Sequence, residues 1–122
     1  MKISQLSQLT GVSIRSLRYY EQQGLISADR ESNGYRTYHP LVIDQVNTIK
    51  FYLNLGFTTE QIAGFLNCVV MNKEAFCSQI LPIYREKLTE IEEQIQLLSQ
   101  IKSNLEDRIQ AVMLENPNPP GA

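Results

Sequence analysis

A short stretch near the start of the chain, Gly11 to Leu25, carries the side chains best suited to chemistry. Within it, Arg15, Arg18, Tyr19 and Gln22 fall at i, i+3, i+4 and i+7, so they share one face of a helix. A guanidinium group binds phosphate or the O6/N7 edge of guanine through two parallel hydrogen bonds, and tyrosine adds a ring and a hydroxyl. This face has the chemistry of a DNA reader. The alternative is an ordinary solvated helix face, since arginine and glutamine are usually exposed.

The neighbouring residues predict the elements that position this face. Ser13 is a good N-cap and Gly24 suits a left-handed stop, which predicts a reading helix from Ile14 to Gln23. A short helix from Ile3 to Leu9 precedes it, and a tight turn containing Gly11 joins the two. This order is the helix-turn-helix pattern, in which the second helix enters the major groove.

The next segment, Ile26 to His39, predicts a two-stranded wing. The Asn-Gly pair that begins at Asn33 is a strong signal for a two-residue hairpin turn, and tyrosine and threonine favour strands. Such a turn places Arg36 and Tyr38 on one face and sets Arg36 opposite Glu31. Arg36 is then either half of a cross-strand pair or a second phosphate clamp, and the neighbouring reading helix favours the clamp.

Two amphipathic helices follow the wing and complete a single core. Pro40 fits the first position of one helix, which ends at Gly56, and Thr58 with Gln61 forms a capping box at the start of the next. The apolar residues at helical spacing are Val42, Val46, Ile49 and Leu53 in the first helix and Ile62, Phe65, Leu66 and Val69 in the second.

A third apolar stripe predicts a long helix from about Gln79 to Leu114, roughly 54 Å in length. Its residues repeat on average every 3.5 positions, the period of a coiled coil. Such a helix is too long for one small core, so we expect the stripe to pack against a second copy; the alternative is a helix folded back on its own domain. The stripe consists of Tyr84, Leu88, Ile91, Ile95, Leu98, Ile101, Leu105, Ile109 and Val112.

These patterns predict three segments in a mainly α fold. Residues 1–72 form a winged helix-turn-helix DNA-binding domain, residues 73–114 a dimerisation helix, and residues 115–122 a disordered tail. The chain has 122 residues and a net charge of −2, but residues 1–40 carry +2 and residues 41–122 carry −4. The basic end is the end with the reading helix, so a few directed phosphate contacts are expected.

Composition also excludes several classes of protein. The chain has no apolar run of membrane-spanning length and no signal-peptide pattern, so a soluble cytoplasmic protein without membrane contact is expected. No constellation of acid, base or nucleophile indicates an enzyme, and no cofactor is expected. Two cysteines without a cluster argue against a disulfide scaffold or a closed zinc site.

The two cysteines lie on either side of the predicted link between the first domain and the long helix. Cys77 precedes a helix whose first turns are marked by Pro82, and amide dipoles at a helix start favour a thiolate. Cys68 and Cys77 are therefore candidate sensor thiols for oxidants, electrophiles or a soft metal. The alternative is that both are small buried apolar residues.

As a set, the motifs resemble the MerR family of bacterial transcription regulators over residues 1–114. The resemblance rests on ISQLSQLTGVS from Ile3, LRYYEQQGL from Leu17, NGYRTY from Asn33 and LGFTTEQI from Leu55. It implies a homodimer joined by an antiparallel coiled coil. It also implies binding to double-stranded DNA at a near-palindromic promoter spacer, which the dimer bends and untwists for RNA polymerase when a signal is present. The DNA contacts it implies are Arg18, Tyr19, Arg36 and Tyr38, with Ser13 and Arg15 as additions.

The resemblance also sets limits. We expect a short member without a C-terminal effector domain. Metal-sensing members place one cysteine near the start of the dimerisation helix, about where Cys77 stands, and a pair beyond its end; no Cys or His follows Leu114, so no complete metal site is expected. The alternatives to a regulator are an architectural or excision-type DNA binder of the same fold and a coiled-coil interaction protein without DNA binding. The signal, the target genes, and activation or repression are left open.

Overall fold

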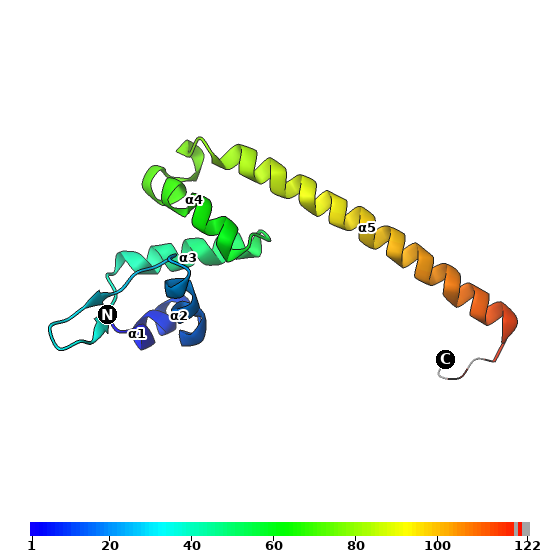
Figure 1. The fold of residues 1–122 in the computed structure, drawn as a ribbon, viewed down its shortest axis with the longest axis horizontal. Coiled ribbons are helices and arrows are strands. Elements are labelled where there is room, and N and C mark those ends of the chain that lie inside the picture. Colours follow the sequence, from blue (N-terminus) through cyan, green and yellow to red (C-terminus); the bar gives the residue numbers. More distant parts are fainter. Residues whose placement is uncertain (119, 121–122) are drawn as a thin grey trace. The chain divides into compact units, whose positions relative to one another are not determined.

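The structure is a computed structural model that describes residues 1–118 and residue 120 (Figure 1). The chain forms two compact units, Met1–Ile83 and Tyr84–Ala122. The described part is mainly helical with a small two-stranded wing and a long C-terminal helix, as predicted. The elements are α1 (Ile3–Thr10), α2 (Ile14–Gln22), β1 (Asp29–Arg30), β2 (Arg36–Thr37), α3 (Leu41–Asn54), α4 (Thr59–Asn72), the 3-10 turn η1 (Glu74–Phe76) and α5 (Ile80–Glu115).

The turn between α1 and α2 is fixed by hydrogen bonds from small polar residues. Gly11 has a φ of 73°, the left-handed conformation that ends α1. The Thr10 hydroxyl donates to the Leu6 carbonyl at 2.8 Å, and the Ser7 hydroxyl donates to the Val12 carbonyl at 2.6 Å. From α3, Lys50 Nζ donates to the Thr10 carbonyl at 2.7 Å, which places a positive charge at the C-terminal end of α1. These contacts hold the turn that joins α1 to α2.

The reading helix forms as predicted and is anchored by its apolar side. The Ser13 side chain accepts a hydrogen bond from the Ser16 amide at 3.1 Å, which caps α2, and Gly24 has a φ of 75° just beyond its end. Leu17 and Tyr20 are buried against the core. This burial leaves the opposite face of α2 to solvent.

The wing differs from the expected hairpin by one residue. Glu31 N–H donates to the Tyr35 carbonyl and Gly34 N–H donates to the Glu31 carbonyl, so the loop has three residues instead of two. Gly34, with a φ of 87°, supplies the left-handed residue that closes a three-residue loop. The strands consequently pair Arg30 with Arg36, and the predicted pairing of Arg36 with Glu31 is wrong.

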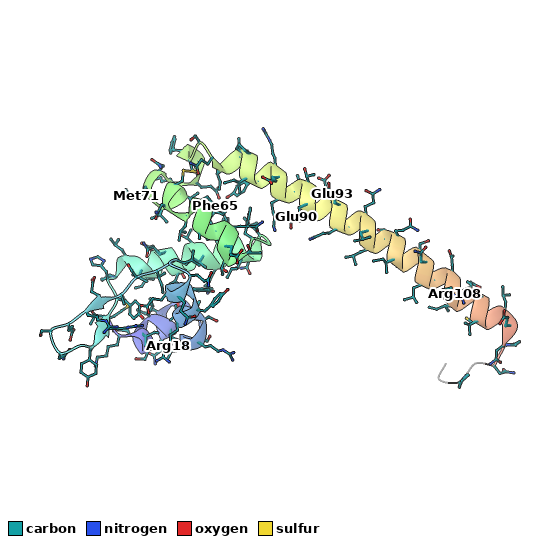
Figure 2. All side chains as sticks on the ribbon, in the orientation of Figure 1. Arg18, Phe65, Met71, Glu90, Glu93 and Arg108 are labelled. Atoms are coloured by element: carbon teal, nitrogen blue, oxygen red, sulfur yellow. A yellow bond between two sulfur atoms is a disulfide. The ribbon has the colours of Figure 1, made fainter. Side chains whose placement is uncertain are left out.

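Helices α3 and α4 supply the centre of the first unit. Tyr52 on α3 lies edge-on to Phe57 and Phe65, with ring centroids 5.9 and 4.7 Å away. Phe65 is labelled on α4 in Figure 2. The Thr58 side chain accepts from the Gln61 amide while Gln61 Oε1 accepts from the Thr58 amide, so the predicted capping box is present.

The long helix α5 also agrees with its sequence period. Pro82 lies in its first turn, where the missing N–H has no partner within the helix to lose. Most of the predicted stripe is open to solvent on the single chain: Leu88, Ile95, Leu98, Ile101, Leu105, Ile109 and Val112 are 51–64% exposed, while Tyr84 and Ile91 are half-buried. No helix in the described part of the chain has the length and apolarity needed to cross a membrane.

Two boundaries of the structure differ slightly from the predicted ones. The first predicted domain ends with α4 at residue 72, whereas the compact unit continues through η1 and the first turn of α5. The predicted tail, 115–122, begins on Glu115, which is the last residue of α5. Residues 119, 121 and 122 lie outside the described residues.

Candidate nucleic-acid interface

The outer face of α2 presents the predicted polar side chains to solvent. Arg15, Arg18 and Gln22 are exposed, and Tyr19 is 46% exposed. Arg18 is labelled on this helix in Figure 2. The Tyr19 hydroxyl lies 3.4 Å from Thr59 Oγ1, so the ring is tethered beside the start of α4. This arrangement agrees with the spacing argument, since Leu17 from the same helix is fully buried.

Ser13 has a structural role that the sequence already indicated. Its oxygen caps α2, and its hydroxyl donates to Ser16 Oγ at 3.0 Å. The side chain remains exposed at the start of the helix. A DNA contact from Ser13 stays a prediction.

The wing is joined to α2 through one carboxylate, Glu21. Arg36 Nη1 forms an ion pair with Glu21 Oε2, and the Tyr38 hydroxyl donates to Glu21 Oε1 at 3.2 Å. The Arg36 side chain is 50% exposed and that of Glu21 is 18% exposed. Glu21 therefore orients the Arg36 side chain through the ion pair, and the exposed part of the guanidinium can still bind an anion.

Tyr38 is buried where the wing meets α2. It is 2% exposed, and its backbone N–H donates to the Met1 carbonyl at 2.7 Å. Burial raises the pKa of the Tyr38 phenol above its ordinary value, and the negative charge of Glu21 acts in the same direction. In this structure the buried ring and the hydroxyl of Tyr38 hold the wing against α2, and a contact between Tyr38 and the DNA backbone stays a prediction.

Two hollows flank the guanidinium groups of Arg18 and Arg36, which line both. The larger, about 630 Å³, lies between α2 and the wing and also includes Arg30. The other, about 410 Å³, includes Lys2 and Tyr35. Two arginines between two concave surfaces offer a path for a phosphate chain, because backbone contacts are made mainly by such groups.

Arg30, Lys2 and Tyr35 are site residues that the sequence prediction missed. Arg30 stands directly opposite Arg36 across the strands, and like charges in that position repel. None of the ion pairs between described residues includes Arg30, so a bound anion would relieve the repulsion. Lys2 Nζ lies 5.3 Å from the centre of the Tyr35 ring. The excess positive charge of residues 1–40 included Lys2 and Arg30, but only the register places Arg30 beside Arg36.

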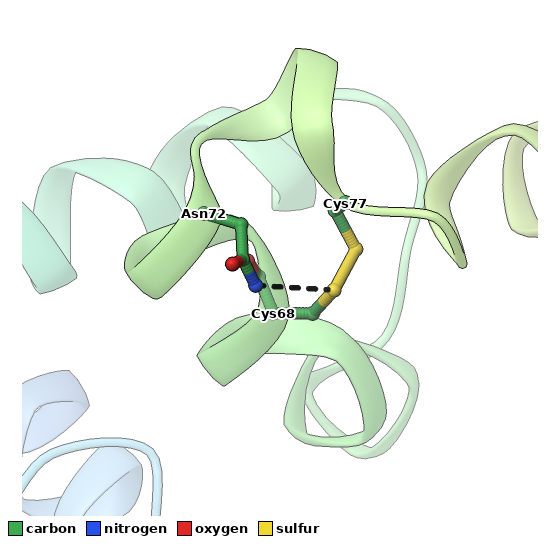
Figure 3. The surroundings of a disulfide bond; sticks show 3 residues. All are labelled: Cys68, Asn72 and Cys77. Carbon is green, nitrogen blue, oxygen red and sulfur yellow. Dashed lines mark hydrogen bonds between the residues drawn. A yellow bond between two sulfur atoms is a disulfide. The ribbon is translucent and has the colours of Figure 1, made fainter.

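The two cysteines are joined to each other by a disulfide bond, with a Cα–Cα distance of 5.5 Å (Figure 3). Cys68 lies on α4 and Cys77 follows η1. Neither cysteine is a free thiol in this structure, and a sensing role for the pair stays a prediction. The alternative of two small buried apolar residues agrees with the 4% exposure of Cys77, whereas Cys68 is only half-buried.

The described residues do not fit a metal centre. No group of three or more His, Cys, Asp or Glu side chains within them is placed to hold an ion. The disulfide occupies both cysteine sulfurs.

Comparison with protein families places this geometry among known proteins. Residues 2–38 match the model for the MerR family regulatory protein, and residues 43–108 match the model described as MerR, DNA binding. The first matched region contains α1, α2 and the wing. The second contains all but the first two residues of α3, the whole of α4 and most of α5.

Individual relatives span most of the chain. It is 31% identical over 111 residues to the HTH-type transcriptional regulator HmrR of Rhizobium leguminosarum bv. viciae, covering 91% of this chain and 85% of that one. It is 35% identical over 107 residues to the mercuric resistance operon regulatory protein of Bacillus cereus, covering 87% and 80%.

Solved structures share the fold. PbrR691 from Ralstonia metallidurans CH34, a transcription regulator in complex with lead(II), has a TM-score of 0.76 at 21% identity, covering 88% of this chain and 83% of that one. HiNmlR, a MerR family regulator lacking the sensor domain and bound to promoter DNA, has a TM-score of 0.55 at 19% identity, covering 89% and 86%.

Proposed function

Because the chain belongs to the MerR family of DNA-binding transcriptional regulators, we propose that it works as a homodimer on a near-palindromic promoter spacer. Each subunit contributes one α2 to the major groove and one wing to the neighbouring backbone. A signal then changes the bend and twist of the spacer, so that RNA polymerase engages the promoter. The regulator itself works in the cytoplasm. Bending a site of this length costs a few kcal/mol, which is enough to serve as the switched quantity.

The observation that carries the proposal is the polar face of α2 beside a wing that holds two opposed arginines. Arg15, Arg18 and Tyr19 are exposed on this face and would meet base edges and phosphates, and Arg36, held by Glu21, would contact the DNA backbone. The repulsion between Arg30 and Arg36 favours an anion between or beside them.

Arg18→Ala tests the reading face. It should weaken binding to the operator by about 1–3 kcal/mol and reduce the salt slope by about 1 if the lost contact is to phosphate. Arg108→Ala is the matched control, because it removes an equal charge from an exposed position on α5. Equal affinities for the two variants in a gel-shift titration at fixed salt would refute the assignment of Arg18.

The proposal of a dimer rests on the exposed stripe of α5. A row of residues more than half exposed, spaced at the coiled-coil period, calls for a second apolar surface. The charged side chains of α5 that lie outside the stripe would stay in water when two such helices pack in antiparallel order. The occupant proposed is α5 of a second copy of the chain.

Ile95→Glu tests the dimer, because it places a charge in the middle of the stripe at a cost of several kcal/mol. Gln96→Glu adds the same charge one residue away, off the stripe, and should leave the dimer intact. Sedimentation at micromolar concentration should show a monomer for Ile95→Glu alone. A wild-type monomer under these conditions would contradict the proposal.

The operator itself can be found without a guess at its sequence. Genomic fragments selected by the purified protein should share an inverted repeat within a promoter spacer, and a footprint should cover that spacer. Protection of long stretches without a promoter would favour the architectural alternative. Failure to select any fragment would contradict DNA recognition by α2.

A further inference from the structure

The disulfide closes a short loop in the segment that connects α4 to α5. It joins Cys68 on α4 to Cys77, nine residues further along the chain (Figure 3). The loop contains the end of α4, Lys73 and η1. Asn72 Nδ2 donates to the Cys68 carbonyl at 3.1 Å and lies 4.0 Å from its sulfur, so the start of the loop is also held by a side chain.

Lys73 inside this loop has an unfavourable backbone conformation. Its φ of 64° and ψ of 158° make it the one non-glycine residue with positive φ in the part of the chain that the structure describes. Only glycine adopts this region readily, and another residue keeps it only where surrounding contacts impose it. The chain reverses at Lys73, and this reversal brings Cys77 close to Cys68 on α4. The disulfide in turn holds Lys73 in its unfavourable backbone conformation.

We propose that Cys68 and Cys77 form a reversible thiol–disulfide site that reacts with low-molecular-weight thiols and disulfides and regulates DNA binding. The inference rests on the proposed function, because a regulator at the chromosome works where thiols are kept reduced. Disulfides in that compartment are usually transient and redox-sensing. Opening the bond frees Lys73 to relax and gives the link to α5 more conformational freedom. The geometry that a dimer imposes on its operator then depends on the redox state of the pair.

The exchange proceeds in two balanced steps. A thiolate of the external thiol attacks Cys68 Sγ, because Cys68 is half-buried whereas Cys77 is 4% exposed, and Cys77 leaves as a thiolate and takes a proton. A second external thiolate attacks the external sulfur of the mixed disulfide and releases Cys68. Two small thiols are oxidised to one disulfide, and two electrons and two protons pass to the protein. A small disulfide such as oxidised glutathione drives the reverse reaction.

Trypsin provides a direct readout, because Lys73 is exposed and lies within the closed loop. The full-length protein is equilibrated in glutathione buffers of different poise, sampled for free thiols by alkylation and mass measurement, and digested briefly. We expect one two-electron transition, with cleavage after Lys73 at least about tenfold faster in the reduced protein, since proteolysis follows the population of the opened loop. Cleavage after Lys102 on α5 is the internal control and should not change.

A double variant, Cys68→Ser with Cys77→Ser, should be cut after Lys73 at the reduced rate in every buffer. If that variant fails to fold, the wild-type titration alone still decides the question. Thiols that appear only after denaturation, or equal cleavage after Lys73 in both states, would overturn the proposal. So would equal affinity and equal bending of operator DNA in the oxidised and reduced protein. Loss of DNA binding in both states, with the redox transition intact, would instead count against the proposed function.

Discussion

Replacing Tyr38 with phenylalanine removes one hydroxyl from the joint between the wing and α2 and leaves the buried ring in place. The hydroxyl donates to Glu21 Oε1 at 3.2 Å, and Tyr38 is 2% exposed. Because burial and Glu21 both raise the pKa of the Tyr38 phenol, the proton needed for this bond is present throughout the neutral pH range. The variant therefore tests the positioning role assigned to Tyr38 without creating a large cavity.

The expected loss follows from the state of Glu21. A hydrogen bond to a charged group contributes about 1.5–3 kcal/mol when well buried. The Glu21 side chain is 18% exposed and keeps its ion pair with Arg36, so we expect a loss of about 1 kcal/mol in the free energy of unfolding. For a domain of this size that loss lowers Tm by about 4–8 °C.

Urea titrations at fixed protein concentration measure this loss, and a double-mutant cycle assigns it. Tyr38→Phe, Glu21→Gln and the combination should show a coupling energy of at least about 0.5 kcal/mol, because the two groups touch. Tyr35→Phe on the same wing is the control; Tyr35 is 61% exposed, and its change should stay within about 0.5 kcal/mol. Equal effects of Tyr38→Phe and Tyr35→Phe, or strict additivity in the cycle, would refute the role of the Glu21 contact.

Three further outcomes are expected. Burial raises the pKa of both Tyr20 and Tyr38 above 10.0, so the unfolded chain releases these protons first as pH rises. The contribution of these raised pKa values to stability is complete below about pH 10 and is lost as pH rises through the folded pKa values. In alkaline urea titrations, the double variant Tyr20→Phe with Tyr38→Phe should show a weaker dependence of stability on pH. Thr58→Ala removes the cap of α4 and should cost about 1 kcal/mol by thermal denaturation, and no change in Tm would contradict the capping contact. The Cys68→Ser, Cys77→Ser variant should be about 2–3 kcal/mol less stable than the oxidised protein in urea, and equal stability would contradict a bond that restricts the unfolded chain.

The parts of the fold that depend on local sequence could be predicted closely. Ser13 and Thr58 each cap the helix that follows, because the signal requires only a side-chain oxygen and the next few amides. The period of α5 likewise follows from the spacing of its apolar residues. The exposed face of α2 could be predicted for the same reason, since burial of Leu17 fixes where Arg15 and Arg18 point.

The wing shows how one residue of loop length changes a site. An Asn-Gly pair is compatible with two-residue and three-residue loops, and local propensity does not separate them. The observed loop places Gly34 in the left-handed position and moves Arg36 opposite Arg30. The burial of Tyr38 depends in turn on how the wing meets Glu21, a tertiary contact between segments 17 residues apart.

The disulfide between Cys68 and Cys77 could not be predicted from the sequence for a related reason. Had α4 continued through the link as a helix, nine residues would have separated Cys68 and Cys77 by roughly 13 Å along its axis. Their Cα atoms lie 5.5 Å apart because the chain reverses at Lys73. A reversal of this kind is ordinarily signalled by glycine or asparagine, and lysine gives no such signal. The pairing therefore depends on the unfavourable backbone conformation of Lys73. Reduction of the disulfide should change the backbone of this segment, because it removes the bond that holds Lys73 in that conformation.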